Sequence, residues 1–528
     1  MTMWMGKTEM ANHLLILPIV LPLLSGALLI LLEKAQSRWV PGVALASMLA
    51  LVWVAVKLLL LADQGGVHVY LLGNWQAPWG IALALDRLSA LMLLLTALVG
   101  LASLGYALGG DDRKGLHFHA LLQFQLMGLN GAFLTADLFN LFVFFEVLLA
   151  ASYGLLLHGA SIERLKASVH YVVFNLTGSA LFLLATSLLY ALTGTLNMAD
   201  LAFKLGQLGP ENLLLAKAGV LLLVVVFAVK AALLPLYFWL PATYASASAP
   251  VAALFAIMTK VGVYAIARVS TLWAGSEAMA GLLSTLLPLF ALGTVVLAAI
   301  GVLAAKQLRT LVAYLVVVSA GTLLLAVGLG SADSLAAGLF YLINSTLIAC
   351  LWFLLADRIS AARGGEDCLS PRPIQSNWGV LGGLFFVASI AIAGVPPLAG
   401  FLGKALLLQA AGHTTLSAWV ASLVLTSSLL IMVALARAGT QIFWVSGSAS
   451  APALKPGPSS AFHAGALSGL LALVLACAVF AGPLYRYAQA TAQQLMQSQS
   501  YIEAVLGAQQ VPAAHDVRKE MRERGDLK

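Results

Sequence analysis

Long apolar runs recur along almost the whole chain, and they restrict its fold more than any other feature. The 528 residues are 61% apolar and only 9% charged, whereas an ordinary soluble protein carries about 25% charged residues. A membrane-spanning helix needs about 20 mostly apolar residues, so the length and the spacing of the runs predict about fourteen spans. The sequence therefore predicts an all-α polytopic membrane protein and excludes a soluble fold.

The predicted spans have boundaries that the hydropathy pattern places to within a few residues. They lie at 13–33, 39–62, 86–107, 117–135, 138–158, 168–192, 213–239, 248–270, 280–304, 308–329, 333–356, 377–410, 416–438 and 462–484. The first run follows Lys7 and has no obvious signal-peptidase site after it, so we expect it to be kept. Translation from Met10 instead of Met1 is an open alternative.

Basic residues distinguish the two sides of the predicted membrane protein. Thirteen lie in the odd-numbered connections and only three, Arg87, Lys204 and Arg268, lie in or beside the even-numbered ones. The thirteen are Lys34, Arg38, Arg113, Lys114, Arg164, Lys166, Lys306, Arg309, Arg358, Arg363, Arg372, Arg437 and Lys455. Cytoplasmic loops are enriched in Lys and Arg, so both termini are predicted on the non-cytoplasmic side. The net charge of +7 therefore reports orientation and not a nucleic-acid partner.

The connection at 67–86 differs from the others because Gly73, Asn74, Pro78 and Gly80 stand among alternating Val, Tyr, Leu and Trp residues. This pattern is typical of a small exposed hairpin. A connection without regular structure is the alternative.

Two other kinds of site are not expected. Cys350, Cys368 and Cys477 are too scattered for a disulfide framework or a CxxC metal site, and we interpret them as buried small apolar residues. Gly403 and Lys404 do not form a P-loop, because the required glycine and Ser or Thr are absent at the matching positions.

Four ionisable residues lie deep inside predicted spans: Glu146, Lys230, Lys260 and Lys404. A charge at the bilayer centre costs about 2.5 to 3.5 kcal/mol on insertion scales, so each of them needs a partner, water or a function. Glu146 is interpreted as half of an intramembrane ion pair, with a glutamate hydrogen-bonded between helices as the alternative. Asp137, near the start of the same span, is expected to be a helix cap.

Lys230 stands five residues before Pro235 in an apolar run. Proline removes a backbone donor and clashes with the preceding turn, so this helix should break close to the lysine. Broken helices at membrane depth commonly line transport sites. Burial favours the neutral form of a lysine, which suits proton exchange near neutral pH; a lysine that reaches back to the interface is the alternative.

Lys260 and Lys404 complete the set. Lys260 shares a helix face with Tyr264, and the small residues before it favour close helix packing. Lys404 follows Pro396 and Pro397 in a second interrupted run. Two breaks, each with its own lysine, suggest two inverted copies of one bundle.

We accordingly expect five parts in the chain: helices 1–3 in 1–116, a first repeat of five helices in 117–270, a second in 280–438, a connection and helix 14 in 439–484, and an extramembrane tail in 485–528. The breaks near Lys230 and Pro235 and near Pro396 and Lys404 belong to the first and second repeats respectively. The mixed charge of the tail predicts a surface helix or disorder.

Three motifs carry a resemblance to a known family: PLYFWLPATYASASAPVAALFAIMTKVGVY, GVPPLAGFLGK and FFEVLL. Together they resemble the proton-translocating, antiporter-like membrane subunits shared by respiratory complex I and the multisubunit Mrp (Mnh or Pha) cation/proton antiporters. The similarity covers about 14–484, and the D subunit of the antiporters is the most similar member. The resemblance implies that Glu146, Lys230, Lys260 and Lys404 are the family's proton-transfer residues.

The resemblance also implies partners: other subunits of a heteromeric antiporter complex, namely A-like, C-like and small membrane subunits, together with protons and Na+ or K+. It places the protein in a bacterial inner membrane, with protons entering and the cation leaving. We expect no cofactor and no metal, because the sequence contains no iron–sulfur ligand set and no nucleotide motif.

Two positions depart from the family pattern. Tyr237 stands where many relatives have a histidine, and the eleventh span offers only Asn344, Ser345 and Thr346 where relatives often have a Lys or His. A proton path from Lys260 to Lys404 would then need water and hydroxyl groups, and Ser319, Thr322 and Tyr341 are candidates. Each of these is also explained as a polar residue that packs between helices.

The leading hypothesis is therefore a proton-conducting subunit of a Na+ or K+/H+ antiporter, in which a Glu146–Lys230 ion pair controls proton transfer to Lys260 and Lys404 governs exchange with the far side. The alternative is a pumping subunit of complex I or a membrane-bound hydrogenase, whose redox groups would belong to partners. A self-sufficient transporter and a structural subunit are further alternatives.

Overall fold

The structure is a computed structural model that describes residues 13–279, 281–371, 378–444 and 460–510. Almost every element is a helix. The helices are α2 (Leu17–Lys34), α3 (Val40–Asp63), α4 (Arg87–Ala107), α5 (Phe118–Leu134), α6 (Leu138–Leu157), α7 (Ile162–Thr193), α8 (Met198–Leu205), α9 (Pro210–Ala231), α10 (Trp239–Ser246), α11 (Ala249–Phe255), α12 (Met258–Leu272), α13 (Leu282–Ala304), α14 (Leu308–Gly328), α15 (Ala332–Ala362), α16 (Trp378–Ala393), α17 (Ala399–Ala411), α18 (Ser417–Gly439), α19 (Ala461–Val479), α20 (Ala481–Met496) and α21 (Ser498–Leu506). Short helical turns lie at Leu72–Asn74, Asp111–Arg113 and Thr440–Trp444.

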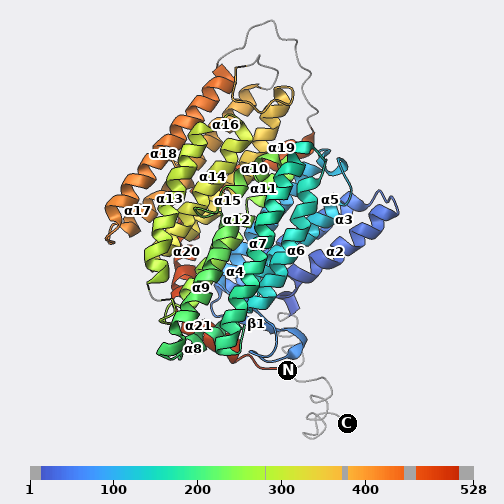
Figure 1. Cartoon of the computed structure of the whole chain (residues 1–528). Coiled ribbons are helices and arrows are strands. Elements are labelled where there is room, and N and C mark those ends of the chain that lie inside the picture. The colour runs from blue at the N-terminus through green and yellow to red at the C-terminus, as the bar shows by residue number, and fades with distance from the viewer. Residues whose placement is uncertain (1–12, 280, 372–377, 445–459, 511–528) are drawn as a thin grey trace.

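The helices form one elongated bundle (Figure 1). Helices α2 and α3 lie along one edge of the bundle, and α16, α17 and α18 lie along the other. Helices α12 and α15 run through the middle, where the protein surrounds them completely. We call the end that carries β1, α8 and α21 the hairpin end, and the opposite end, with most of the loop Lys and Arg residues, the basic end.

The structure confirms an all-α polytopic membrane protein. Among the described residues, twelve helices are long and apolar enough to cross a membrane, and the shorter apolar helices α16 and α17 follow one another at the second break. The count of fourteen spans, the five-part division and the inverted repeats stay predictions. Met1, Met10 and the last tail residues, 511–528, lie outside the described ranges.

The predicted hairpin is present at 67–86. Strand β1 (His68–Leu71) pairs antiparallel with β2 (Ala82–Leu85). The expectation that the hairpin is exposed was wrong for β2, whose four residues are all buried. They are buried because β2 also contacts the end of α5, where the amide of Ala136 donates to the carbonyl of Ala82.

Arg268 corrects the predicted loop arrangement. It lies inside α12 and is buried, with both terminal nitrogens bonded to the carboxylate of Asp86 at 2.5 and 2.9 Å. Its charge is therefore neutralised inside the protein, so it does not report sidedness. Arg372 and Lys455 lie outside the described residues.

Both predicted helix breaks are present. Helix α9 ends at Ala231, just after Lys230, and α10 begins only at Trp239. The freed backbone groups find other partners: the amide of Leu234 donates to Thr294 Oγ1, and the indole of Trp239 donates to the carbonyl of Val229. Buried backbone groups need such partners because an unpaired one is costly in an apolar environment.

The second break separates α16 from α17 at Gly394 to Leu398. Gly394 has a positive φ of 76°, and a Cβ there would lie 2.8 Å from Lys404 Cδ. Lys404 therefore lies after its break, on α17, whereas Lys230 lies before its break, on α9. The two lysines therefore do not occupy equivalent positions relative to their breaks, and the inverted repeats stay a prediction.

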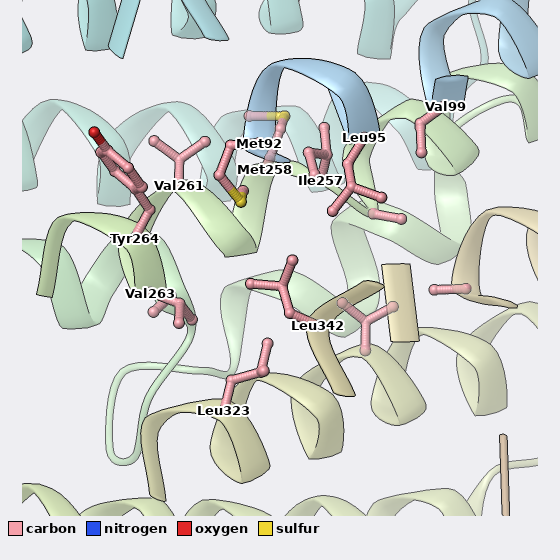
Figure 2. Close-up of a cluster of buried hydrophobic side chains, with 14 of the residues drawn as sticks. Met92, Leu95, Val99, Ile257, Met258, Val261, Val263, Tyr264, Leu323 and Leu342 are labelled. Carbon is pink, nitrogen blue, oxygen red and sulfur yellow. The ribbon is translucent and has the colours of Figure 1, made fainter. Parts of the chain in front are cut away.

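Apolar packing holds the middle of the bundle together (Figure 2). Met92 and Leu95 of α4 and Val261 of α12 belong to a buried cluster that continues to Leu323 of α14 and Leu342 of α15. Met92, Leu323 and Leu342 line a cavity of about 20 Å³ between α4, α12, α14 and α15.

The three cysteines are free thiols. Cys350 and Cys477 are buried, as expected, but Cys368 is exposed in the segment after α15, which corrects the expectation for that residue.

Candidate functional site

Glu146 lies midway along α6 and is half-buried. Ser179 of α7 donates its hydroxyl hydrogen to Glu146 Oε1. Among the ion pairs of the described residues, none joins Glu146 to Lys230. The structure therefore shows the carboxylate held by a hydroxyl group and not in the direct ion pair that the leading hypothesis pictured.

Lys230 lies at the last turn of α9 and is 8% exposed. Its ammonium group donates to Asn175 Oδ1 of α7 at 2.9 Å and stands 5.8 Å from the ring centre of Phe145. Asn175 and Ser179 are four residues apart and therefore share one face of α7. That face therefore contacts both the lysine and the carboxylate, and Glu146 attracts Lys230 electrostatically.

A cavity of about 20 Å³ adjoins Lys230, and Asn175, Tyr171, Met258 and Val261 contribute to its lining. A volume of this order holds one water molecule when polar groups are present to bond it. Because Met258 and Val261 flank Lys260 on α12, the cavity lies on the side of Lys230 that faces the helix of the next lysine.

Lys260 is fully buried in the first turn of α12. Its ammonium group donates to Ser319 Oγ of α14 at 2.8 Å and to Thr259 Oγ1 at 3.3 Å. Ser319 was one of the three hydroxyl residues proposed for the path beyond Lys260, and the structure places it in direct contact with this lysine. Thr322 instead donates to the carbonyl of Val318 in its own helix.

Lys404 is 7% exposed on α17 and donates to the carbonyl of Ala393 at 2.8 Å and to Ser428 Oγ of α18 at 2.9 Å. The carbonyl of Ala393 lies at the end of α16, where the break leaves it without a helical partner. Tyr341 lies close to Gly403, one residue before the lysine. The second break thus supplies one ligand of its own lysine.

The three lysines share one chemical feature. Each ammonium group is bonded to neutral oxygen atoms, and within the described ranges none of the three forms an ion pair. A buried cation without a carboxylate partner loses its proton more readily than a paired one. This arrangement suits groups that take up and release protons.

Sequence reasoning missed Asn175, Ser179 and Ser428, which hold the predicted residues in place. The signal for the first two was available: they are polar, four residues apart and on the buried face of a long apolar helix. Asp137 is confirmed as a cap, since its carboxylate accepts from the amide of Asn140 at 2.8 Å. Tyr237 lies in the first break and is half-buried.

No group of three or more His, Cys, Asp or Glu side chains in the described part of the chain is arranged to hold a metal ion.

The geometry agrees with comparisons to known proteins. A family model described as NADH:quinone oxidoreductase/Mrp antiporter, TM, matches residues 135–431, a range that includes Glu146 and all three lysines. The chain belongs to this family. It is therefore a multi-pass membrane subunit of the antiporter-like type.

Relatives and a solved complex agree with this assignment. The chain is 42% identical to the D subunit of a probable K(+)/H(+) antiporter of Rhizobium meliloti, over 95% of this chain and 99% of the relative. It is 37% identical to the D subunit of a Na(+)/H(+) antiporter of Bacillus subtilis, over 94% and 99% of the two chains. A chain of the Mrp complex from Dietzia sp. superposes with a TM-score of 0.84 at 26% identity, covering 94% of this chain and all of that one.

Proposed function

We propose that this protein is the proton-translocating subunit of a multisubunit Na+ or K+/H+ antiporter, and that protons pass along Glu146, Lys230, Lys260 and Lys404. The observation that carries the proposal is the set of three buried ammonium groups bonded only to neutral oxygens. None of the three ammonium groups is tied to a carboxylate by a direct ion pair among the described residues, so each can lose its proton without breaking such a pair. The partners of such a protein are further membrane subunits, including A-like and C-like ones.

Proton transfer begins, in this proposal, at Lys230. When Ser179 holds Glu146 and Asn175 is the partner of Lys230, the ammonium group is less stabilised than in a direct ion pair and passes a proton through the neighbouring cavity toward Lys260. At Lys260 the proton passes on to the hydroxyl group of Ser319, which accepts a hydrogen bond from this lysine. Lys404, which lies beside the second helix break, exchanges protons with the far side of the membrane.

The membrane orientation is part of the proposal. The basic end faces the cytoplasm, because Lys and Arg residues gather there, and both termini lie on the other side. The relatives include subunits named for K+ and for Na+, so the antiport assay described next has to identify the transported cation.

The test is cation/proton antiport in everted vesicles from an antiporter-deficient host. The complete gene cluster is compared with the same cluster carrying Lys230→Ala. We expect added Na+ or K+ to dissipate the pH gradient only with the unchanged cluster, at equal protein levels. Antiport that survives Lys230→Ala would refute the proposed path.

The same experiment also tests a second function, because the description of the matched family includes NADH:quinone oxidoreductase. If neither cation acts and an electron donor drives proton uptake instead, the chain serves a redox-driven pump. The lysines would then carry protons in both cases, but the energy would come from electron transfer in partner subunits.

A further inference from the structure

The first helix break has an apolar pocket beside it. The pocket has a volume of about 120 Å³ and lies between α9, the break that follows it and the start of α13. All of its lining residues are Leu, Val, Ala, Pro or Phe. They include Val224, Ala228, Leu234, Pro235, Leu286 and Phe290. Water finds no hydrogen-bond partners among such side chains, whereas a dry apolar cavity of about 150 Å³ binds a molecule as large as benzene.

The pocket opens toward the outside of the bundle. Leu221, Leu286 and Phe290 in its lining are 39%, 39% and 37% exposed, and Pro235 is exposed as well. Both α9 and α13 are long and apolar enough to cross a membrane. Exposed apolar side chains in the middle of such helices face the acyl chains of the bilayer and not water. The pocket is therefore in contact with lipid hydrocarbon.

One cation lies on the same helix face as the pocket. Lys217 precedes Leu221, Val224 and Ala228 at the spacing of one face of α9. With a rise of 1.5 Å per residue, it lies about 6 to 16 Å from these three residues along the helix axis. Half of the hydrocarbon core is about 15 Å thick, so the two features are spaced like the phosphate and the acyl chain of one lipid.

The charge of Lys217 is available to a ligand. The residue is half-buried, and among the described ion pairs none includes its ammonium group. Glu211, the acidic residue of the same helix, accepts instead from the side-chain amide of Asn212. A lysine two turns inside a membrane helix extends its ammonium group toward the headgroup layer, where lipid phosphates lie.

The pocket also touches the break itself. The amide of Leu234 donates to Thr294 Oγ1 of α13 at 2.9 Å, while the side chain of Leu234 lines the pocket. Ala228, another lining residue, stands two positions before Lys230. A chain in the pocket therefore packs against the end of α9 and against the break at the same time.

We propose that this pocket and Lys217 form a phospholipid site, in which one acyl chain fills the pocket and the phosphate group pairs with the ammonium group of Lys217. The bound chain braces the break next to Lys230. A whole helix of a partner subunit is too large for this pocket, because a helix with its side chains is about 10 Å across. The site goes beyond the proposed function, since it binds lipid whichever ion the protein carries.

The test uses phosphatidylglycerol with a photoactivatable diazirine in one acyl chain. The purified complex is placed in lipid nanodiscs that contain this lipid, and labelled peptides are mapped by mass spectrometry after illumination. We expect labelling to concentrate on residues 221–236 and 286–290. The exposed face of α7, where Val169 and Val173 are each more than half exposed, should be labelled several-fold less.

Two variants with matched controls test the two parts of the site. Val224→Phe fills the pocket, whereas Leu214→Phe adds the same ring at a position of α9 that is 80% exposed and outside the pocket. Lys217→Gln removes the free charge, whereas Lys204→Gln removes a charge that is paired with Asp200 at 3.0 Å. We expect labelling to be largely lost in Val224→Phe, to fall about fivefold in Lys217→Gln, as for one basic residue at an anionic lipid surface, and to stay unchanged in both controls.

A diacylglycerol with the same diazirine separates the phosphate from the chain. It has no phosphate, so it should label the unchanged protein and Lys217→Gln equally. Even labelling over all lipid-facing helices, or labelling that neither Val224→Phe nor Lys217→Gln lowers, would overturn the proposal. Lys217→Gln changes a partly exposed side chain and so keeps the test decisive if Val224→Phe does not assemble.

A photoreactive amino acid at Leu286 identifies the occupant directly. Capture of the phospholipid agrees with the proposal, and capture of a peptide from a neighbouring subunit would refute it. Lys230→Ala separates this proposal from the proposed function, because Lys230 does not line the pocket and its replacement should leave the labelling unchanged. Antiport that survives Lys230→Ala would therefore refute only the proposed function, and even labelling beside an inactive Lys230→Ala would refute only the lipid site.

Discussion

The two broken helices hold their lysines in different surroundings. Lys230 bonds Asn175 of α7, and Ser179, one turn further along the same helix, bonds the carboxylate of Glu146 on α6. Lys404 bonds a backbone carbonyl and Ser428, and no described carboxylate forms an ion pair with it. The first lysine therefore has an acidic neighbour that acts on it electrostatically, and the second has neutral hydrogen-bond partners.

The covering helices differ in the same way. Several polar residues lie on the buried face of α7, and one of them, Asn175, bonds Lys230. The buried face of α18, which contributes Ser428 to Lys404, is mostly apolar, with Ser427 as its one polar residue among those described. If the proposed path is correct, this difference predicts that control by charge belongs to the first break.

The largest effect should follow from Glu146→Ala. Because the first site depends on its carboxylate, this change should abolish antiport while the protein still assembles. Glu146→Gln keeps a partner for Ser179 without the charge, so it separates the charge from the hydrogen bond. Vesicle antiport assays with a native gel of the complex measure both properties, and normal antiport in Glu146→Ala would remove the basis of the comparison.

Ser428→Glu would make the second site resemble the first. A carboxylate at this position would attract the ammonium group of Lys404 and keep it protonated. We expect antiport to fall several-fold and its pH profile to move upward by about one unit, since a nearby opposite charge has an effect of this order. Ser428→Gln is of similar size without the charge and should leave the profile in place; an equal shift in both variants would contradict the explanation.

The sequence predicted the charged residues of both sites but not their surroundings. A charge in an apolar run and a proline close to it are visible in the chain, so Glu146, Lys230, Lys404 and the two breaks were found. The separation of Glu146 from Lys230 by Asn175 and Ser179 depends on how α6, α7 and α9 pack together. A local sequence pattern does not predict how helices pack. The ion pair between Arg268 and Asp86 was missed for the same reason, because the two residues are 182 positions apart in the sequence.

Ser319→Ala tests the connection between the two sites. Lys260 would lose its 2.8 Å bond and keep only the weaker one to Thr259. A neutral hydrogen bond contributes about 1 kcal/mol, so we expect antiport to slow about threefold to tenfold. Thr310→Val is the control on the same helix, because Thr310 lies near the start of α14, more than two turns from Ser319, and its hydroxyl donates to Gln307 Oε1 at 3.3 Å. Equal rates in both variants and the unchanged protein would exclude Ser319 from the path.

The smallest expected effect is on stability, and it concerns the hydrogen bonds that join helix ends at the basic end, in the first and the second half of the chain respectively. In the first half, Arg164 bonds backbone carbonyls, which do not titrate in this range. In the second half, Asp367 accepts from the amide of Arg309 at the start of α14. Burial raises the pKa of the Asp367 carboxyl to about 6, although Arg309 opposes the shift.

The folded state thus binds this proton more tightly than the unfolded chain, in which an aspartate has a pKa of about 3.9. The stability that the bound proton contributes is complete below pH of about 4 and is lost as the pH rises through 6. After screening by solvent, the loss should be about 1 to 2 kcal/mol. Thermal unfolding of the purified complex between about pH 4 and 7 should therefore depend less on pH in Asp367→Asn, while Asp333→Asn, an exposed residue at the start of α15, should keep the original dependence. If Asp367→Asn keeps the original pH dependence as well, Asp367 does not contribute to it. The difference between the two regions is then confined to the lysine sites.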